Sequence, residues 1–430
     1  MSAELKQRSY WRDTISVSTS QTPSLPAQAD VAVIGGGITG LCAARALAKR
    51  GVRVAVLETH TVGWGASSRN GGMVLTGLKL GVETLIARYG LEQARRLYQA
   101  SVESVDLVER IVQDERIECQ FKRCGHLSLA SKPAHYEHFA RSAELLARDF
   151  SCATRLVPRA DLHTEIGSDA YYGGMVDEVS GGINPAQYVE GLARAARNAG
   201  ATLHENSSVQ RVTRQGSRWR LSTSHGALDA GDILVASSGY TGAVVPKLQR
   251  KLLPIGSYII VTEPLTDAQA REISPRARMM YDSRHFLHYF RLTPDRRLLF
   301  GGRARFVPET EATIRESAAE LRSGMLNVYP QLRGVRVEYA WGGTLDFTYD
   351  TMPHLGQIDG YYYALGYAGH GVALASLLGS QVGSTMGTAG LQASPFAQIL
   401  FPGAPLGLHQ AKPWFLGLAA SWYRFLDRVN

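Results

Sequence analysis

The chain has 430 residues, and its 46 Lys and Arg against 38 Asp and Glu give a formal net charge of +8. Hydrophobic residues make up 45% of it, which excludes a mainly disordered chain because so apolar a sequence can bury enough surface to fold. At about 150 residues per domain, the length predicts two or three domains. The 44 glycines are about 10% of the chain, above the usual ~7%, and there is no G-X-Y period that would indicate collagen.

Charge and cysteine content exclude several classes of function. The basic residues are scattered, and no zinc-finger spacing or basic zipper appears, so we expect no nucleic-acid partner. The four cysteines form no CxxC pair, which predicts no metal site. Few cysteines, no signal peptide and no run of 18 apolar residues predict a cytoplasmic protein without a spanning helix.

The N-terminal third opens with a strand, a glycine-rich turn, a helix and a second strand. Residues 1–29 are polar and read as an N-terminal extension. A buried strand is predicted over 30–34, a helix over 41–50 that ends at Gly51, and a second strand over 52–58. This is a complete strand–helix–strand unit of about 30 residues.

Between the first strand and the helix, Gly35, Gly37 and Gly40 form a G-x-G-x-x-G motif that includes Ile38 and Thr39. The first glycine permits the tight turn, the second lets a pyrophosphate approach, and the third allows close packing of helix on strand. Glu58 ends the second strand, where its carboxylate can accept from a ribose hydroxyl without a 2′-phosphate. The unit predicts a dinucleotide site and leaves NAD and FAD open.

A long loop rich in glycine and hydroxyl residues follows at 63–72. In NAD folds another helix would normally start there, so this loop suits a longer ligand, with Ser67 and Ser68 donating to phosphate and ribityl oxygens. A flexible surface loop is the alternative.

Further along, the hydrophobic pattern alternates between helical and strand periods. Helices are predicted over 84–118, 133–150, 185–200 and 309–328, and strands over 125–130, 201–205, 208–213, 218–222, 233–236 and 361–365. Strands over 252–263, 285–292 and 296–304 indicate a mixed or antiparallel sheet. A second glycine-rich segment, 366–371, enters a helix that ends near residue 387.

Taken together, these motifs resemble the D-amino-acid-oxidase superfamily of FAD-dependent amine oxidases, which includes glycine and sarcosine oxidases. Within it the gamma-glutamylputrescine oxidases are most similar. The resemblance spans about residues 10 to 390, and its motifs lie at 35–40 with Glu58, 65–72, 289–292, 298–302, 341–344 and 366–371.

The resemblance implies an α/β fold with a Rossmann-type FAD-binding domain, built on a parallel sheet, over 30–83, 160–250 and 335–395. A discontinuous substrate domain on a mixed or antiparallel sheet is expected over 84–159 and 251–334, and a helical tail over 396–430. The residues expected to bind FAD are Gly35, Gly37, Ile38, Thr39, Gly40, Glu58, Thr59, Gly65, Ala66, Ser67, Ser68, Arg69, Asn70, Gly71, Gly72, Val209, Ser238, Gly239, Gly343, Gly366, Gly369, His370 and Gly371.

Catalysis in this family is hydride transfer from the carbon that bears a neutral amine to the flavin, and His370, Arg69 and Tyr289 are the catalytic candidates. His370 precedes a helix whose N-terminus would stabilise reduced, anionic flavin; a packed histidine and a structural arginine are the alternatives. No cysteine precedes Thr344-Leu345-Asp346, so FAD is expected to be non-covalent. The resemblance to sarcosine oxidases implies a lysine near the flavin that activates O2, but residues 298–302 contain none. Both O2 and an electron-transfer partner therefore stay open as the electron acceptor.

The substrate is expected to be a small amine that yields an imine, then a carbonyl compound and an amine or ammonia, with O2 reduced to H2O2. Strand alternation places His285, Tyr289 and Arg291 on one face, and with Tyr258 they are the substrate candidates. Arg291 could hold a carboxylate or phosphonate, with a surface salt bridge as the alternative. A gamma-glutamyl amine is favoured, and sarcosine, glycine or an aminophosphonate remains open. Residues 412–426 could contact a membrane surface or dock on the FAD domain.

Overall fold

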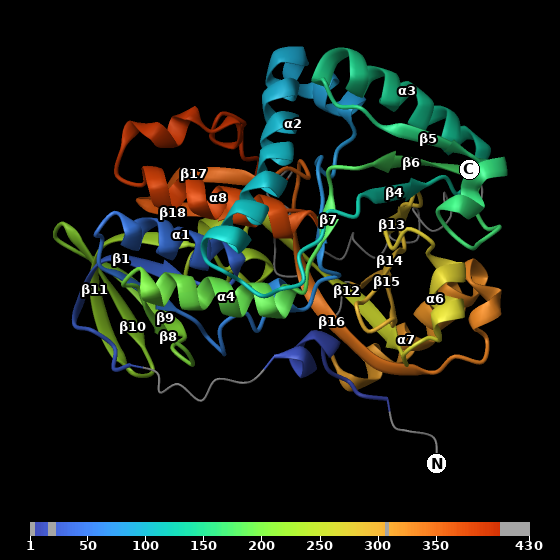
Figure 1. Ribbon diagram of the computed structural model, residues 1–430. Coiled ribbons are helices and arrows are strands. Elements are labelled where there is room, and N and C mark those ends of the chain that lie inside the picture. Colours follow the sequence, from blue (N-terminus) through green and yellow to red (C-terminus); the bar gives the residue numbers. More distant parts are fainter. Residues whose placement is uncertain (1–4, 16–22, 306–308, 405–430) are drawn as a thin grey trace.

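The computed structural model describes residues 5–15, 23–305 and 309–404, with the side chains of 303–305 left out (Figure 1). Two eight-stranded sheets lie on opposite sides of the molecule in Figure 1 and define its two parts. A two-stranded sheet, β3 (Met73–Val74) with β7 (Gly181–Gly182), completes the strands. The fold is the expected α/β architecture with parallel and antiparallel strands.

The first sheet has the order β17-β18-β11-β1-β2-β8 and carries the dinucleotide motif. Its parallel strands are β1 (Gln28–Ile34), β2 (Val54–Leu57), β8 (Thr202–His204), β11 (Gly226–Val235) and β18 (Tyr361–Leu365). The antiparallel strands are β17 (His354–Ile358) at the edge, and β9 (Val209–Gln215) and β10 (Arg218–Thr223), which pair beside β11.

Both faces of this sheet are covered, as a parallel sheet requires. Val31 and Val33 pack with α1 (Ile38–Lys49), α4 (Pro185–Asn198) and α8 (Gly371–Thr385), whereas Ala32 packs with the β9–β10 side. Helix α1 contacts both α4 and α8. The strand end and the start of α1 are therefore held rigidly where a cofactor must bind.

The second sheet has the order β16-β12-β15-β14-β13-β4-β6-β5 and is antiparallel except between β13 and β4. Its strands are β4 (His126–Leu129), β5 (Arg155–Pro158), β6 (Gly173–Asp177), β12 (Leu252–Thr262), β13 (Met279–Asp282), β14 (Tyr289–Leu292), β15 (Leu298–Arg305) and β16 (Val337–Thr348). The other helices are α2 (Val82–Asp114), α3 (Pro133–Phe150), α5 (Pro246–Gln249), α6 (Asp267–Ile273) and α7 (Glu311–Val328).

The structure corrects several expected boundaries. Strands β6 and β16 fall in the ranges expected for the FAD domain, but they pair within the second sheet, β16 with β12 along nearly its whole length. The expected strand over 285–292 begins only at Tyr289, because Arg284 and His288 donate their backbone N–H groups to the Asp282 carboxylate and fold the preceding segment back. Helix α2 is interrupted at Gly90, where φ is 75°.

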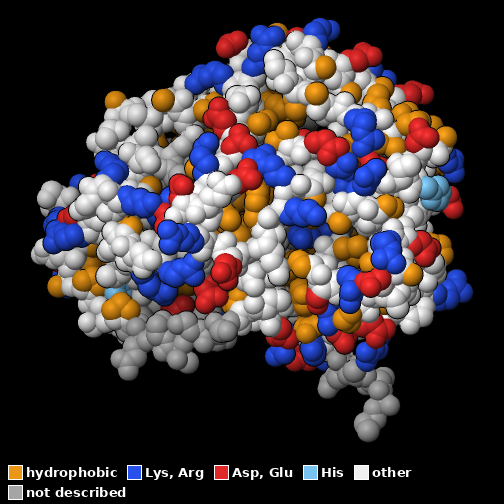
Figure 2. All heavy atoms as spheres, viewed as in Figure 1, with side chains coloured by type: hydrophobic (Ala, Val, Ile, Leu, Met, Phe, Trp, Pro, Cys, Tyr) orange, Lys and Arg blue, Asp and Glu red, His pale blue; other side chains and the backbone are white. Residues whose placement is uncertain are grey.

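The N-terminal extension is also more than a linker. Lys6 forms a bridge with Tyr339, and the fully buried Trp11 lies in a cluster with residues of the second sheet. Residues 405–430, which include the segment for which docking on the FAD domain or membrane contact was open, lie outside the described part of the chain. On the face that Figure 2 shows, Lys and Arg are interspersed with Asp and Glu. Among the described helices, none is both long and apolar enough to cross a bilayer.

Candidate FAD and substrate site

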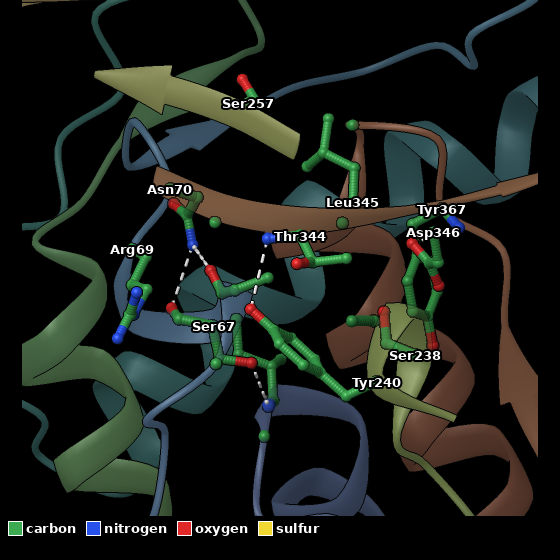
Figure 3. Close-up of a pocket in the computed structure, with 18 of the residues that line it drawn as sticks. Ser67, Arg69, Asn70, Ser238, Tyr240, Ser257, Thr344, Leu345, Asp346 and Tyr367 are labelled. Carbon is green, nitrogen blue, oxygen red and sulfur yellow. Dashed lines mark hydrogen bonds between the residues drawn. The ribbon is translucent and has the colours of Figure 1, made fainter. Parts of the chain in front are cut away.

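A cavity of about 1230 Å³ extends from the carboxyl end of β1 to the second sheet, and Figure 3 shows part of its wall. Pockets for drug-sized ligands usually measure ~300–1000 Å³, so this space can hold more than one small molecule. It joins the dinucleotide motif to β12 and β14, so both predicted sites open into the same cavity.

The dinucleotide turn has the geometry that its glycines predict. Gly35 has φ of +110°, a conformation that L side chains rarely adopt. A Cβ on Gly40 would lie 2.0 Å from the carbonyl oxygen of Gly35, so only glycine lets α1 pack this closely. A Cβ on Gly37 would meet Ser67 Oγ at 2.7 Å on the cavity side. Glycine at 37 thus leaves room for Ser67 beside the start of α1, and a helix start of this kind can bind a phosphate.

Glu58 is held at the adjacent strand end by backbone donors. Its Oε2 accepts from Gly36 N at 2.7 Å, and its Oε1 accepts from His60 N at 2.9 Å. The carboxylate lines the cavity, where it remains available to a ribose hydroxyl. The acid that the sequence placed after the second strand therefore lies at the expected end of the nucleotide site.

The loop over 63–72 is tied to α1 and closed on itself. Ser67 Oγ accepts from Ile38 N at 3.0 Å, and Asn70 Nδ2 donates to the carbonyls of Ala66 and Ser67 (Figure 3). Ser68 differs from its neighbour, because its hydroxyl donates to Gly63 O and does not line the cavity. This is a hydrogen-bonded wall, in contrast to the alternative of a flexible surface loop.

Two indole groups hold the same loop from behind. Trp11 Nε1 donates to Asn70 O, and Trp341 Nε1 donates to Arg69 O, each at 2.8 Å. Ser9 Oγ also donates to Ser68 O at 3.2 Å. The N-terminal segment and β16 therefore position the loop backbone that faces the cavity.

Arg69 and Tyr289 line the cavity on the side of the second sheet. Arg69 donates to Glu309 at 3.2 Å and to the carbonyl of Trp64, and its guanidinium stacks over the Trp64 ring. Tyr289 OH lies 3.3 Å from Ser257 Oγ, and burial raises the pKa of Tyr289 to about 12. Tyr289 is therefore neutral at physiological pH and can act as a hydrogen-bonding group.

The second glycine-rich segment closes the other end of the cavity. Asp346 is buried and accepts from Gly366 N at 2.6 Å and Tyr367 N at 3.2 Å. Burial raises the pKa of Asp346 to about 6 despite these donors. Tyr367 OH in turn hydrogen-bonds Thr39 Oγ1 at 2.7 Å, which ties this segment to α1. Asp346 and Tyr367 are labelled in Figure 3. Asp346 was not among the predicted site residues, although its position beside Thr344-Leu345 was a usable signal.

His370 is the N-cap residue of α8 and lines the cavity in a half-buried position. Burial and the nearby Lys79 ammonium lower the pKa of His370 to about 3. Its buried Nδ1 has no hydrogen-bond partner among the described residues. His370 is thus a neutral imidazole with one nitrogen free for a ligand and is a poor proton acceptor.

Most of the predicted site residues do line the cavity. They are Gly35, Gly37, Ile38, Thr39, Glu58, Thr59, Gly65, Ala66, Ser67, Arg69, Asn70, Gly71, Val209, Ser238, Gly343, Gly369, His370, Gly371, His285 and Tyr289. Seven others lie behind its wall: Gly40, Ser68, Gly72, Gly239, Gly366, Tyr258 and Arg291. The glycines in this second group serve close backbone packing, as at Gly239, where a Cβ would meet Leu345 O at 2.9 Å.

Two substrate candidates do not reach the cavity. Arg291 is buried, and its guanidinium donates to the carbonyls of Gly72 at 2.8 Å and Ile183 at 3.0 Å. Tyr258 lies in the core of the second domain, and its hydroxyl donates to Thr313 at 3.4 Å. Strand alternation correctly put Arg291 on the same face as Tyr289, but it could not show which part of that face adjoins the cavity.

Several cavity-lining residues were missed by the sequence reasoning. Tyr240 OH accepts from Thr344 N at 3.2 Å and stands in the middle of the wall in Figure 3. Lys79 and Tyr281 also line the cavity, from a loop before α2 and from β13. Isolated residues of these types carry no local motif, so only the fold brings them to the site.

Comparison with known proteins agrees with this geometry. The family model described as FAD dependent oxidoreductase (DAO) matches residues 30–384. The chain belongs to this family. The FAD-dependent oxidoreductase is 33% identical over 431 residues to the probable oxidoreductase OrdL of Haemophilus influenzae, with 98% of each chain covered. It is 30% identical to the gamma-glutamylputrescine oxidoreductase of Escherichia coli, with 93% of each chain covered.

Its fold is similar to the crystal structure of glycine oxidase from Geobacillus kaustophilus. The TM-score is 0.72 at 22% identity, over 90% of this chain and all of that one. This oxidoreductase uses FAD and acts on amine-type substrates. The cavity-lining Gly37 at the start of α1, the Glu58 carboxylate and the unpaired Nδ1 of His370 are the features of this chain that fit FAD.

Proposed function

We propose that this oxidoreductase oxidises a primary or secondary amine to an imine, with FAD held non-covalently and O2 as the final acceptor. The observation that carries the proposal is the continuous cavity from the dinucleotide turn to Tyr289 and His285 of the second domain. Bound FAD supplies the redox chemistry by accepting the hydride from the carbon that bears the amine. The imine then hydrolyses to a carbonyl compound and an amine or ammonia.

Non-covalent binding is supported by the position of the cysteines. Cys42, Cys119 and Cys152 are buried elsewhere, and no cysteine of the described chain lines the cavity. The chain's contribution is therefore to bind through hydrogen bonds: the α1 start and Ser67 toward phosphate, Glu58 toward ribose, and His370 with the α8 start toward the ring system.

We propose a gamma-glutamyl amine, such as gamma-glutamylputrescine, as the substrate. A relative of 30% identity over nearly the whole chain carries that substrate in its name. Such a molecule has an α-carboxylate at the end remote from the reacting carbon. Lys79 lines the cavity and has no carboxylate partner among the described residues, so it is suited to bind that group where Arg291 is not.

The test is an anaerobic screen of the holoenzyme in which flavin absorbance is followed. The amines are gamma-glutamylputrescine, sarcosine, glycine, putrescine and an aminophosphonate. Bleaching by gamma-glutamylputrescine alone supports the proposal, bleaching by sarcosine or glycine alone replaces the substrate, and bleaching by none refutes amine oxidation. Readmitting air and measuring peroxide against an artificial electron acceptor then tests O2.

A further inference from the structure

Behind the cavity wall lies a buried polar network that runs from Ser128 to Asp177, and Tyr281 lies beside Ser128. Tyr281 of β13 lines the cavity, and its cross-strand neighbour in β4 is Ser128. Ser128 Oγ lies 3.3 Å from Nε2 of His126, and His126 Nδ1 lies 3.3 Å from Asp177 Oδ2. His126, Ser128 and Asp177 are all at most 5% exposed and lie on the adjacent strands β4 and β6, which Figure 1 labels.

The hydrogen bonds of this network have a fixed direction. Asp177 accepts from Thr76 Oγ1 at 2.6 Å and from Ser180 Oγ at 2.7 Å. Ser180 therefore donates its only proton to Asp177. His126 Nδ1 lies 3.0 Å from Ser180 Oγ and must be the donor in the hydrogen bond between these two atoms. In a neutral imidazole the lone pair then lies on Nε2, which faces Ser128.

The same reasoning extends the direction to the cavity. Ser128 donates to His126 Nε2, and its oxygen keeps lone pairs at the strand position beside Tyr281. Burial raises the pKa of Tyr281, so Tyr281 retains its proton at neutral pH. The Tyr281 ring is also stacked on the His126 ring with centroids 5.3 Å apart, which holds the three groups in order.

The network ends at Asp177, which is ionised. Burial opposes ionisation of Asp177, but hydrogen bonds from His126 and the two hydroxyls outweigh it and hold its pKa well below the usual value. Tyr98 and Cys152 face Asp177 from the helical side, and burial raises the pKa of both, so they stay neutral. On the cavity side, His370 is neutral, and Lys79 and Arg69 are cations that line the cavity.

We propose that Tyr281, Ser128 and His126 form a relay that takes the proton from the substrate ammonium before hydride transfer. An ammonium has no lone pair to assist loss of hydride from its carbon, so the amine must first become neutral. The Tyr281 oxygen accepts the ammonium proton and passes its own to Ser128, which passes its own to His126 Nε2. The product is a His126 imidazolium beside the Asp177 carboxylate, and the proton returns to cavity water by the reverse path.

This relay rests on amine oxidation as the proposed function, and the test separates the two. Anaerobic reduction of the flavin by gamma-glutamylputrescine is measured by stopped flow from pH 6 to 10, for wild type, Tyr281→Phe, Ser128→Ala and His126→Gln. Tyr171→Phe is the matched control, because it removes a buried hydroxyl that has no partner among the described residues. If no amine on the panel reduces wild type, the proposed function fails and the relay with it.

We expect Tyr281→Phe to slow flavin reduction at pH 7 on the order of ten- to a hundredfold, the lower range of general acid–base effects. The rate should approach that of wild type at pH 10, where free amine is abundant, and Tyr171→Phe should follow wild type throughout. A Tyr281→Phe profile that matches wild type, or that is lowered equally at every pH, overturns the relay.

A second measurement does not depend on turnover. Nitrogen-15 NMR of the histidine-labelled holoenzyme reports which ring nitrogen carries the proton, and His126→Gln assigns the signal by its loss. At neutral pH without substrate we expect His126 to be protonated at Nδ1 only. A resting imidazolium with both nitrogens protonated would leave no site for the proton and would refute the relay even if His126→Gln itself failed to fold.

Discussion

Replacing Gly37 by alanine tests the assignment of the dinucleotide turn most directly. The new Cβ would lie 2.7 Å from Ser67 Oγ, closer than real Cβ contacts, so the Ser67 side chain must move. That movement breaks the bond of 3.0 Å in which Ser67 Oγ accepts from Ile38 N at the start of α1. The methyl group also occupies the surface that a pyrophosphate must approach.

The magnitude follows from these two losses. A hydrogen bond of this kind contributes about 1 kcal/mol. With a contact between the methyl group and phosphate added, the loss of FAD binding energy should reach about 1.5 to 3 kcal/mol, roughly a 10- to 150-fold rise in Kd. The fold should persist, because the neighbour that must move is the end of a side chain and not backbone.

The assay is titration of apoprotein with FAD, followed by quenching of flavin fluorescence. Gly334→Ala is the control, since a Cβ there would meet nothing within 4 Å and its backbone is not in the positive-φ region. The double variant Gly37→Ala with Ser67→Ala removes the clash but not the methyl group, so it measures how much of the loss comes from Ser67. A Kd for Gly37→Ala equal to that of Gly334→Ala, with helix content unchanged, would refute the placement of the pyrophosphate.

Three further variants address the support of the site. Trp11→Phe leaves the Asn70 carbonyl without its 2.8 Å donor and should destabilise the loop by about 1–3 kcal/mol, which would be seen as flavin release at a lower temperature. Trp219→Phe is the control, because the Trp219 indole N–H has no partner among the described residues, and it should leave the temperature of flavin release unchanged. Arg291→Lys should weaken flavin retention while KM changes less than twofold, and a large KM change alone would restore Arg291 as a substrate ligand. Burial raises the pKa of Asp346 to about 6, so protonation of Asp346 stabilises the folded state by roughly 3 kcal/mol below about pH 4, and this stabilisation is lost as the pH rises to 6. Asp346→Asn should therefore flatten the dependence of the unfolding free energy on pH in this range. An unchanged dependence would contradict the burial argument.

Local chemistry explains which parts of the site were predictable. The turn over 35–40 and the loop over 63–72 are each read from a few consecutive residues, because glycine marks a backbone position that other residues cannot adopt. The same holds for the helix start at Gly371, where the glycines immediately precede a helical pattern. Hence the FAD side of the cavity follows from the sequence in most of its residues.

The substrate side depends on tertiary contacts that no local pattern carries. Arg291 and Tyr289 are two apart on β14 and so share a face of the sheet, but this does not say which part of that face adjoins the cavity. In the structure Tyr289 reaches the cavity, whereas the Arg291 guanidinium bonds two backbone carbonyls, one of them Gly72, next to the FAD loop. Burial lowers the pKa of Arg291 to about 10 without changing its charge at physiological pH. An arginine in such a strand has the same sequence signature whether it binds a substrate or a backbone.

The buried network behind Tyr281 shows the same limit from the opposite direction. His126 and Ser128 face the same way on β4 because they are two residues apart, and this much is readable from the sequence. Their partner Asp177 lies about 50 residues later on β6, and Tyr281 about 150 residues later on β13. Parallel pairing of β13 with β4 is what sets Tyr281 opposite Ser128, and a shift of one residue in that register would turn Tyr281 away from both the cavity and His126. The relay therefore depends on the register between β13 and β4. This explains how residues in segments without a catalytic motif can still form the proposed path for a proton.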